Sequence, residues 1–405
     1  MAGHGHIPYW LRVVFAQVFV AGILLPTAAP AQTGYYLTPS LSVAEVYDDN
    51  VFFTPSPRTH DFLTRISPGL KAAYQSAPLT VEEGYSKASS QPAPLTVEGG
   101  YSFDSEIYSQ HQELTTPQMR QRGSLEVKVM PDPVLTLSVA GAYYQTKTPQ
   151  ELNLTTGLAA RRVLAERYTA SPGFTYRFDP LTTVKGNYAF SKDLLAGGIT
   201  IDSHIENLVL DHRLSPRDTV GPGYVGRQFA FAGSPALTSH AFTLGWSHEL
   251  TPLTTFTLRG GPRVTEGTVD RLPEASASFS HTLKRGEVSL SYTSTLTTVI
   301  GQAAAAMAQG ITGKATTELL PKLVFSAGPA IYRVSSDAFK ATVYSVILEA
   351  SHQLTKALAL QASYQYSFQR GSFNPQTGPT GPTTVEILHN IFLIRLTVTY
   401  PARVD

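Results

Sequence analysis

The 405 residues carry 31 basic and 30 acidic side chains, and this balance excludes the strongly basic footprint of a nucleic-acid-binding protein. Cysteine is absent, which excludes disulfides, thiolate metal sites and a cysteine nucleophile. Charged residues make up only 15% of the chain, below the roughly 25% of an ordinary soluble domain. The composition therefore favours a protein with much apolar surface.

The first 31 residues have the pattern of a secretory signal peptide. Arg12 precedes an apolar run at 13–25, and Ala29 and Ala31 satisfy the A-x-A cleavage pattern. We predict a signal peptide at 1–31 and a mature chain at 32–405; the alternative is an N-terminal anchor helix. Beyond Ala31, no apolar run approaches the roughly 20 residues of a membrane-spanning helix. A mature chain that crosses a membrane must then do so as a closed barrel.

A tandem duplication follows within 77–102. The motif APLTVE-x-GYS begins at Ala77 and again at Ala93. One copy suffices for a strand, so we expect the second to lie in a barrel wall, with the fate of 77–91 left open. Alternation then places Val97, Gly99 and Tyr101 toward lipid, with Glu98, Gly100 and Ser102 toward the lumen.

The rest of the chain repeats one pattern, in which bulky apolar residues alternate with small or polar residues. Stretches 135–144, 181–190, 242–250, 287–299 and 358–369 show it, and this period of two is typical of β-strands. Very short connections between the predicted strands alternate with longer connections. This alternation is typical of outer-membrane barrels and not of soluble β-sandwiches. We predict an all-β fold, a single closed antiparallel barrel of about 18 strands (16–20), with short periplasmic turns and longer extracellular loops.

Aromatic residues and prolines mark the predicted strands. An interfacial aromatic girdle is expected to face lipid; its candidates are Tyr143, Tyr188, Trp246, Tyr364 and Tyr366. Proline cannot donate a ladder hydrogen bond, and the neighbouring glycines suggest β-bulges. Bulges are therefore expected at Pro68, Pro172, Pro222, Pro262 and Pro329.

The final strand alternates through Leu396, Val398 and Tyr400. A terminal strand with an aromatic residue near its end resembles the signal that the barrel-insertion machinery reads, so that machinery and outer-membrane lipid are expected partners. The tail after Tyr400 departs from the usual pattern, in which the aromatic residue is the last one.

The residues YDDNVF at 47–52 and RISPGL at 65–70 resemble the N-terminal signature of a family of porin-like bacterial outer-membrane β-barrels. The segments 151–168 and 176–183 match further along. The resemblance implies a barrel in the bacterial outer membrane. It also implies an association with gene clusters for exopolysaccharide export, and hence export-system proteins as partners. The duplication departs from the family pattern.

The inward phase of the strands predicts a polar wall. Ten basic and two acidic residues are placed there: Arg65, Lys71, Glu126, Lys128, Arg167, Arg177, Lys185, Arg227, Arg259, Arg263, Glu274 and Arg395. A cationic, hydroxyl-rich wall would favour anionic or polar solutes, including acidic sugars. Alternatively, these charges pair with each other and only solvate the wall.

We find no sequence pattern that demands chemistry. Asp48, Asp49 and Asn50 could help bind calcium, but they lack the spacing of a calcium loop, so a solvated turn and no metal are expected. His60 and His111 lie near outward loops without a serine motif, which argues against a surface hydrolase. We therefore expect a porin-like channel without cofactors, for exopolysaccharide export or passage of polar or anionic solutes. A plugged structural or adhesive barrel is the alternative.

Overall fold

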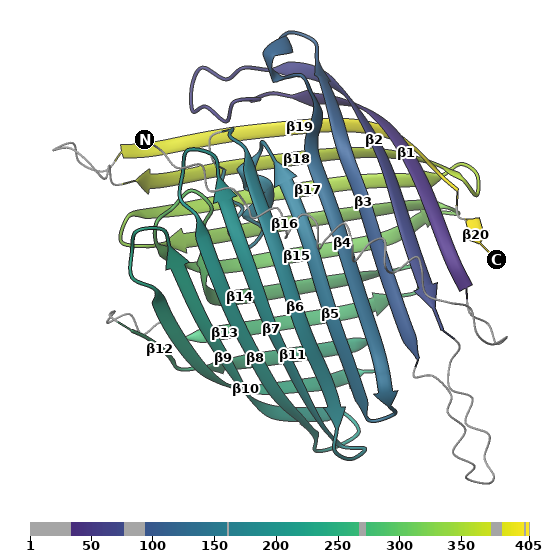
Figure 1. The fold of residues 1–405 in the computed structure, drawn as a ribbon, viewed down its shortest axis with the longest axis vertical. Coiled ribbons are helices and arrows are strands. Elements are labelled where there is room, and N and C mark those ends of the chain that lie inside the picture. The colour runs from purple at the N-terminus through teal and green to yellow at the C-terminus, as the bar shows by residue number, and fades with distance from the viewer. Residues whose placement is uncertain are drawn as a thin grey trace.

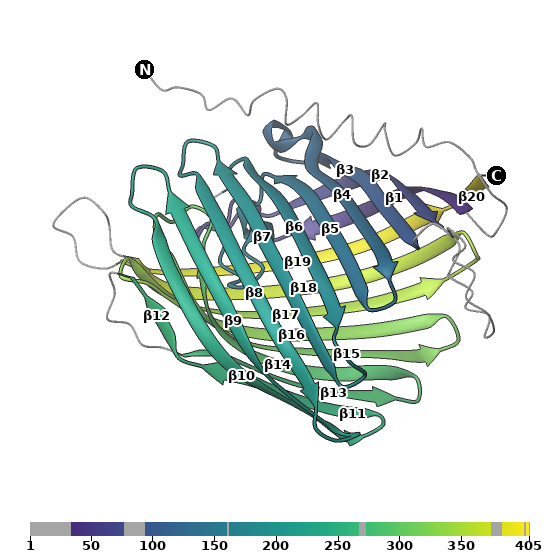
Figure 2. The same cartoon turned by 60° about the horizontal axis from the view of Figure 1, so that its bottom comes forward.

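The computed structural model describes residues 34–76, 94–159, 162–266, 273–373, 383–400 and 402–404. These residues form one antiparallel sheet that closes on itself as a barrel (Figure 1). Turning the barrel by 60° shows β3–β10 along one side of the wall and β13–β19 along the other (Figure 2). None of the helices in the described residues is long and apolar enough to span a membrane.

The first half of the wall contains ten strands. They are β1 (Gly34–Asp48), β2 (Asp61–Gln75), β3 (Leu95–Tyr108), β4 (Thr116–Asp132), β5 (Leu135–Thr146), β6 (Ala165–Arg177), β7 (Thr182–Leu195), β8 (Ile201–Arg213), β9 (Asp218–Phe231) and β10 (Leu237–Thr251). Two short 3₁₀ helices interrupt the loops between them. They are η1 (Gln112–Leu114) and η2 (Pro149–Leu152).

Ten further strand segments complete the wall. They are β11 (Thr254–Gly261), β12 (Arg263–Thr265), β13 (Glu274–Leu283), β14 (Gly286–Thr298), β15 (Ala305–Leu320), β16 (Leu323–Ser335), β17 (Phe339–Gln353), β18 (Leu358–Phe373), β19 (Thr383–Thr399) and β20 (Ala402–Val404).

The described segments make 18 wall strands, as predicted. β11 and β12 pair in succession with β10 and count as one strand. β20 continues β19 along the beginning of β1 and does not add a strand. Pairing of β1 with β19 from Ser40–Thr399 to Asp48–Ile391 closes the barrel, so the wall has no free edge along these residues.

The two rims differ as the sequence indicated. At one rim, the connections after β4, β6, β8, β10, β13, β15 and β17 have two to four residues. Both the start of β1 and the end of β19 lie there, and we call it the short-turn end. The opposite rim, the long-loop end, carries the connections 49–60, 109–115 and 147–164.

Six tyrosines on the outward phase share one geometry. In each pair, the phenol hydroxyl hydrogen-bonds a polar side chain that lies two residues closer to the long-loop end, at 2.5–3.0 Å. The pairs are Tyr101–Gln121, Tyr143–Gln145, Tyr168–Glu166, Tyr188–His204, Tyr224–His240 and Tyr364–Asn390. Rings toward the short-turn end and hydroxyls toward the loops are what a boundary between hydrocarbon and headgroups requires.

The prolines do not produce the expected bulges. Pro68, Pro172, Pro222 and Pro329 keep strict register with one neighbouring strand. With the other neighbouring strand two residue pairs are missing in each case, but the register is the same before and after the gap. The missing N–H therefore leaves a local gap in one ladder. Only Pro262 breaks a strand, because it separates β11 from β12.

The second copy of the duplication lies in β3. Tyr101 and Ile107 are exposed on its outer face, whereas Asp104 and Glu106 are buried on its inner face. Val97 and Gly99 share the outward phase of Tyr101, and Glu98, Gly100 and Ser102 share the inward phase. The first copy, 77–91, lies outside the described residues, as does the signal-peptide prediction.

Candidate functional site

The loop 147–164 between β5 and β6 folds into the barrel at the long-loop end. Its Leu158 is only 3% exposed and packs against Val334, Ala341 and Val343 on the inner wall of β16 and β17. The backbone N–H of Ala159 donates to Oε1 of Gln369 on β18 at 2.7 Å. These contacts join a loop that leaves from β5 to strands across the barrel, so the loop obstructs the lumen.

The tip of the β14–β15 hairpin reaches back from the other side. Ile300 is 2% exposed and packs with Leu152 of η2 and Ala165 of β6. Its backbone N–H donates to Oδ1 of Asn153 at 3.0 Å. The loop and the hairpin tip therefore contact each other inside the lumen at the long-loop end, a region here called the mouth.

A third apolar cluster fills the mouth beside β8 and β9. Leu296 and Met307, from the end of the β14–β15 hairpin, pack with Ile201, Phe229 and Phe231. All five side chains are at most 8% exposed. Contacts between β14–β15 and β8–β9 require the hairpin to lean over the lumen. This part of the mouth is thus closed by close-packed apolar groups.

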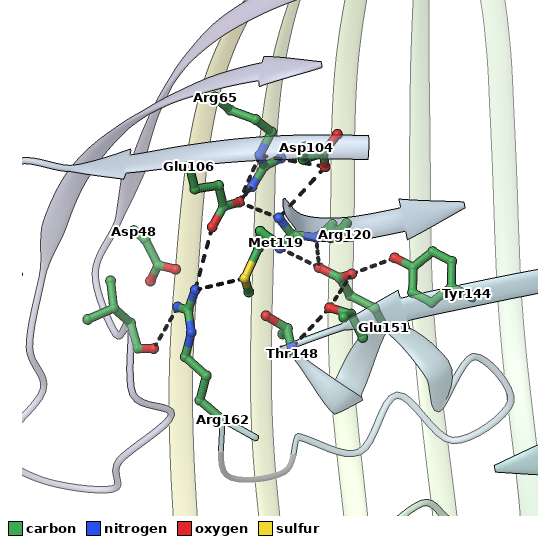
Figure 3. A network of polar contacts seen from close by, with 12 residues as sticks. Asp48, Arg65, Asp104, Glu106, Met119, Arg120, Tyr144, Thr148, Glu151 and Arg162 are labelled. Atoms are coloured by element: carbon green, nitrogen blue, oxygen red, sulfur yellow. Dashed lines mark hydrogen bonds and ion pairs between the residues drawn. The ribbon is translucent and has the colours of Figure 1, made fainter. Parts of the chain in front are cut away.

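The side of the mouth toward β2–β5 is instead polar, with an ionic network under the loop (Figure 3). Arg120 of β4 stands at its centre and donates to Glu106 of β3, while its Nε donates to Oε1 of Glu151 at 2.6 Å. Arg65 of β2 also pairs with Glu106, at 2.8 Å. Because Glu151 belongs to η2 in the loop, Arg120 ties the loop to the wall.

Glu151 is held ionised by its neighbours. Burial raises its pKa, but the Arg120 charge and hydrogen bonds from Arg120 and Tyr144 outweigh this and leave the pKa below its ordinary value. The Tyr144 hydroxyl donates to Oε2 at 2.5 Å, and the Thr146 hydroxyl does so at 3.1 Å. Glu151 therefore anchors the loop as a carboxylate.

The loop has a second ionic anchor at Arg162. Its guanidinium donates to the backbone oxygen of Val51 at 3.2 Å and lies 3.5 Å from Oε2 of Glu106. Arg162 thus connects loop 147–164 with both loop 49–60 and β3. Above these groups opens a cavity of about 650 Å³, here called the vestibule. It is lined by Phe52, Phe53, Thr54, Pro55, Glu113, Leu114, Lys147, Arg162 and Val163.

The twelve predicted wall residues all lie on inward phases. Most have a partner at 2.6–3.9 Å: Arg65–Glu106, Lys128–Glu126, Arg167–Asp193, Lys185–Asp211, Arg227–Glu274, Arg259–Asp211 and Arg263–Glu274. Lys71, Arg177 and Arg395 have no ion-pair partner at such distances among the described residues. Most of the predicted charged residues therefore form ion pairs with other residues of the wall.

The ten basic and two acidic residues that were predicted do not give the charge balance of the whole wall, because further inward charges lie beside them. The prediction omitted the inward acids Asp104, Glu106, Asp193 and Asp211, and Glu151 of the loop. It also omitted Arg120 and Arg122, which lie on the same strand phase as the predicted Glu126 and Lys128. Extending the alternation along β3 and β4 could have found the strand residues.

Arg395 of β19 differs from the other arginines. Arg395 pairs across strands with Ala44 of β1, and Ala44 pairs on its other side with Arg65 of β2. The two arginines therefore flank one small residue in the same cross-strand row. The Nε of Arg395 is buried and has no hydrogen-bond partner among the described residues. The side chain of Arg122 nearby is 48% exposed, and its Nη2 lies 3.8 Å from Oδ2 of Asp104 and donates to the Tyr144 hydroxyl at 3.4 Å. Both retain capacity to bind an anion.

The predicted acidic turn at 48–50 closes the barrel seam. Oδ1 of Asp48 accepts hydrogen bonds from Nε2 of His389 and from the backbone of Asn50, at 2.8 and 2.9 Å. Asp49 pairs with Arg58 and accepts two hydrogen bonds from Asn390. Asp48, Asp49 and His389 lie close enough to hold a metal ion, but Oδ1 of Asp48, Nε2 of His389 and both carboxylate oxygens of Asp49 already take part in hydrogen bonds with protein groups.

The predicted outer-loop histidines do not form a nucleophile–base pair in the described residues. Nδ1 of His111 lies 2.9 Å from Oδ2 of Asp61. The nearby Ser109 hydroxyl donates to the other oxygen of Asp61, not to His111. The ring of His60 lies against Tyr47. The geometry of a Ser–His–Asp triad, in which the serine bonds the histidine, is therefore not formed.

The predicted lipid-facing aromatics all lie on outward phases. Tyr188 and Trp246 are 36% and 39% exposed. Trp246 lies near the short-turn end and donates to Asp218, whereas Tyr143, Tyr188 and Tyr364 belong to the six hydrogen-bonded tyrosines. Tyr366 pairs across strands with Asn390. The predicted insertion residues Leu396, Val398 and Tyr400 are exposed at 43%, 46% and 69%.

Solved structures with a similar chain path include OccAB4 of Acinetobacter baumannii, with 13% sequence identity and a TM-score of 0.47 over 93% of this chain and 100% of that one. OpdQ of Pseudomonas aeruginosa has 10% identity and a TM-score of 0.46, with the same coverage. The ferric enterobactin receptor PfeA of Pseudomonas aeruginosa has 11% identity and a TM-score of 0.43, over 92% of this chain and 81% of that one. No protein-family model and no curated protein sequence matches the chain.

Proposed function

We propose that the protein is a bacterial outer-membrane channel for small polar solutes, preferentially anionic ones, and that it acts by guided passage without chemistry. The closed wall satisfies the backbone hydrogen bonds that lipid cannot. The outward tyrosines mark one membrane boundary. Leucines exposed at the short-turn end, such as Leu181, Leu214 and Leu253, suit the other boundary. By the habit of such barrels, the short turns face the periplasm and the loops face outward.

The arginine cluster beside the loop 147–164 carries the proposed preference for anions. Five guanidiniums meet four carboxylates there, so this region is slightly cationic. They are Arg65, Arg120, Arg122, Arg162 and Arg395 against Asp104, Glu106, Glu151 and Glu349. Arg122 is exposed and makes its polar contacts through Nη2 alone, at 3.4 and 3.8 Å, and Nε of Arg395 has no hydrogen-bond partner among the described residues. A solute that enters through the vestibule would meet these donors, and fixed positive charge in a narrow passage concentrates anions.

The size of the passage bears on the solute. Apolar packing closes the mouth beside β8, β9 and β14–β17, so only the polar side near the vestibule is suited to passage. This arrangement favours small carboxylates or short acidic sugars. Export of an exopolysaccharide, which the family resemblance implies, would require loop 147–164 to leave the lumen.

The proposal is tested by single-channel currents from the refolded chain in planar bilayers. Arg122→Gln and Arg395→Gln are compared with Arg177→Gln, an inward arginine at the short-turn end of β6. At about 6 Å from a permeating ion, a unit charge contributes roughly 0.7 kcal/mol in water, or about threefold in occupancy. We expect each test substitution to lower the anion-to-cation permeability ratio about threefold at low salt, and Arg177→Gln to change it less.

A ratio that Arg122→Gln and Arg395→Gln leave unchanged would contradict the proposed selectivity. A folded barrel that stays silent at all voltages would instead support the second candidate function, a plugged structural or adhesive barrel. The three apolar clusters in the mouth favour that alternative. Block of wild-type currents by a tricarboxylate, weakened in Arg395→Gln, would support the channel and its solute class together.

A further inference from the structure

The outer surface of β15–β19 changes character within one step along the strands. One cross-strand row on the outward face is entirely apolar: Ile311, Ile331, Tyr344, Phe368 and Leu388. The next outward row toward the long-loop end is entirely polar: Gln309, Arg333, Thr342, Arg370 and Glu386. On β18 and β19 this change lies on the loop side of Tyr364 and Asn390, so it marks the loop-side edge of the apolar outer surface, and the polar row stands beyond the tyrosine boundary.

Three basic side chains stand directly beyond that edge. Arg333 of β16 and Arg370 of β18 lie in the polar row on either side of Thr342, and Lys340 of β17 lies two residues closer to the loops. With adjacent strands about 4.8 Å apart, the two arginines are about 10 Å apart at their backbones. All three residues are exposed. We call this set the basic patch.

The charge of the basic patch is only partly neutralised by protein. Arg370 pairs with Glu386 at 3.3 Å, and both side chains are more than half exposed. Arg333 and Lys340 have no ion-pair partner within 4.0 Å among the described residues. The patch therefore carries a net charge of +2 against the membrane. An exposed pair such as Arg370–Glu386 is weak and can exchange for another anion.

The opposite side of the barrel lacks this feature. On β6–β8, at the level of Tyr168 and Tyr188 or closer to the loops, the outward face carries Glu166, Asp202 and Glu206 with one base, Lys192. Lys192 is paired with Asp202 at 3.6 Å. The concentration of positive charge on β16–β18 therefore has no counterpart on β6–β8.

We propose that the basic patch binds the phosphate groups of a phosphorylated glycolipid in the outer leaflet. This inference rests on the proposed outer-membrane placement. The apolar row of Tyr344 and Phe368 would contact acyl chains, while the arginines and the lysine would meet phosphates at headgroup height. Guanidinium groups bind phosphate with two parallel hydrogen bonds, and three cations spread over about 10 Å suit a headgroup with two phosphates rather than one.

The test measures binding of diphosphorylated lipid A to the full refolded chain in neutral detergent by native mass spectrometry. The variant Arg333→Gln/Lys340→Gln/Arg370→Gln removes the patch, and Lys192→Gln removes one charge at similar height elsewhere. Each basic residue near an anionic membrane surface contributes about 1 kcal/mol, or about fivefold. We expect the triple variant to bind at least about tenfold more weakly and Lys192→Gln to bind like the wild type.

A second substitution works in the opposite direction and guards against loss of folding. Glu386→Gln removes the competing carboxylate and should strengthen binding of diphosphorylated lipid A about threefold to fivefold. Equal binding by the wild type and the triple variant would overturn the proposal. So would equal binding of phosphatidylglycerol, or full competition by millimolar inorganic phosphate, because either shows that no glycolipid is preferred. Channel currents that persist in the triple variant would show that the proposed function stands independently.

Discussion

Replacing Glu151 by glutamine tests whether the ionic network keeps the loop 147–164 in the lumen. The substitution keeps the shape of the side chain and an oxygen for the Tyr144 hydroxyl, but it removes the charge that Arg120 contacts at 2.5 Å. Breaking a buried ion pair costs about 3–5 kcal/mol. Arg120 keeps its contact with Glu106, and the Glu151 side chain is 27% exposed, so we expect a smaller loss of about 2 kcal/mol.

A loss of about 2 kcal/mol corresponds to about a thirtyfold shift in the balance between the docked and the released loop. Single-channel recording reads this directly, because release of the loop opens a larger cross-section. We expect Glu151→Gln to raise the fraction of time spent at high conductance about thirtyfold. The apolar contacts of Leu158 and Ile300 remain, so the loop should still return to the docked state.

The matched control is Glu126→Gln. Glu126 also lies on the inward wall next to a base, but its side chain is 55% exposed and its contact with Lys128 is 3.9 Å long. Among the described residues, Glu126 forms no ion pair with a loop residue, so its removal should leave gating unchanged. If Glu151→Gln and Glu126→Gln behave alike, the ionic network does not hold the loop and our reasoning fails.

Three further predictions concern the same mouth. The pKa of Glu151 lies below its ordinary value of 4.5, so the anchoring by its carboxylate is complete above pH 4.5 and is lost as the pH falls through the lowered pKa. High-conductance openings should therefore become more frequent on acidification of the wild type. They should not do so in Glu151→Gln. Leu158→Ala should release the loop by about 2–5 kcal/mol, seen as frequent openings, whereas Leu154→Ala in the same loop should have no effect because Leu154 is 75% exposed. His389→Ala leaves the buried Asp48 without its main partner and should lower the free energy of unfolding by about 1–3 kcal/mol, as measured by urea unfolding in micelles; an unchanged midpoint would contradict this role of the seam.

The wall could be predicted from the sequence because its pattern is local. Alternation with a period of two fixes which side chains face inward, whatever the neighbouring strand is. For that reason Arg65, Arg227 and Arg395 could be placed on the inner face, and Tyr188 and Trp246 on the outer one. The same rule places Asp104 and Arg120, which the prediction did not include, on the inner face near the long-loop ends of β3 and β4.

The mouth could not be predicted in the same way. Glu151 and Arg162 lie in a loop, where no period relates sequence to direction. Leu158 contacts strands nearly 150 residues or more further along the chain. Such contacts depend on the diameter and curvature of the closed barrel, which exist only after all strands have paired. The sequence shows that this loop contains apolar residues, but no local sequence pattern distinguishes a loop that enters the lumen from a loop that covers the rim.

The division of the mouth into an apolar side and an ionic side has a consequence for how the channel could open. Separating the apolar clusters costs free energy in proportion to the apolar area that becomes exposed. Modest changes in pH or salt alter this free-energy cost little. The ionic side responds to both, because protonation of Glu151 or screening of Arg122 weakens it at little structural cost. An arriving anionic solute can also take the place of a carboxylate on Arg122 or Arg395. Opening should therefore begin at the network between Arg120 and Glu151, with the contacts of Leu158 serving as the fixed point to which the loop returns.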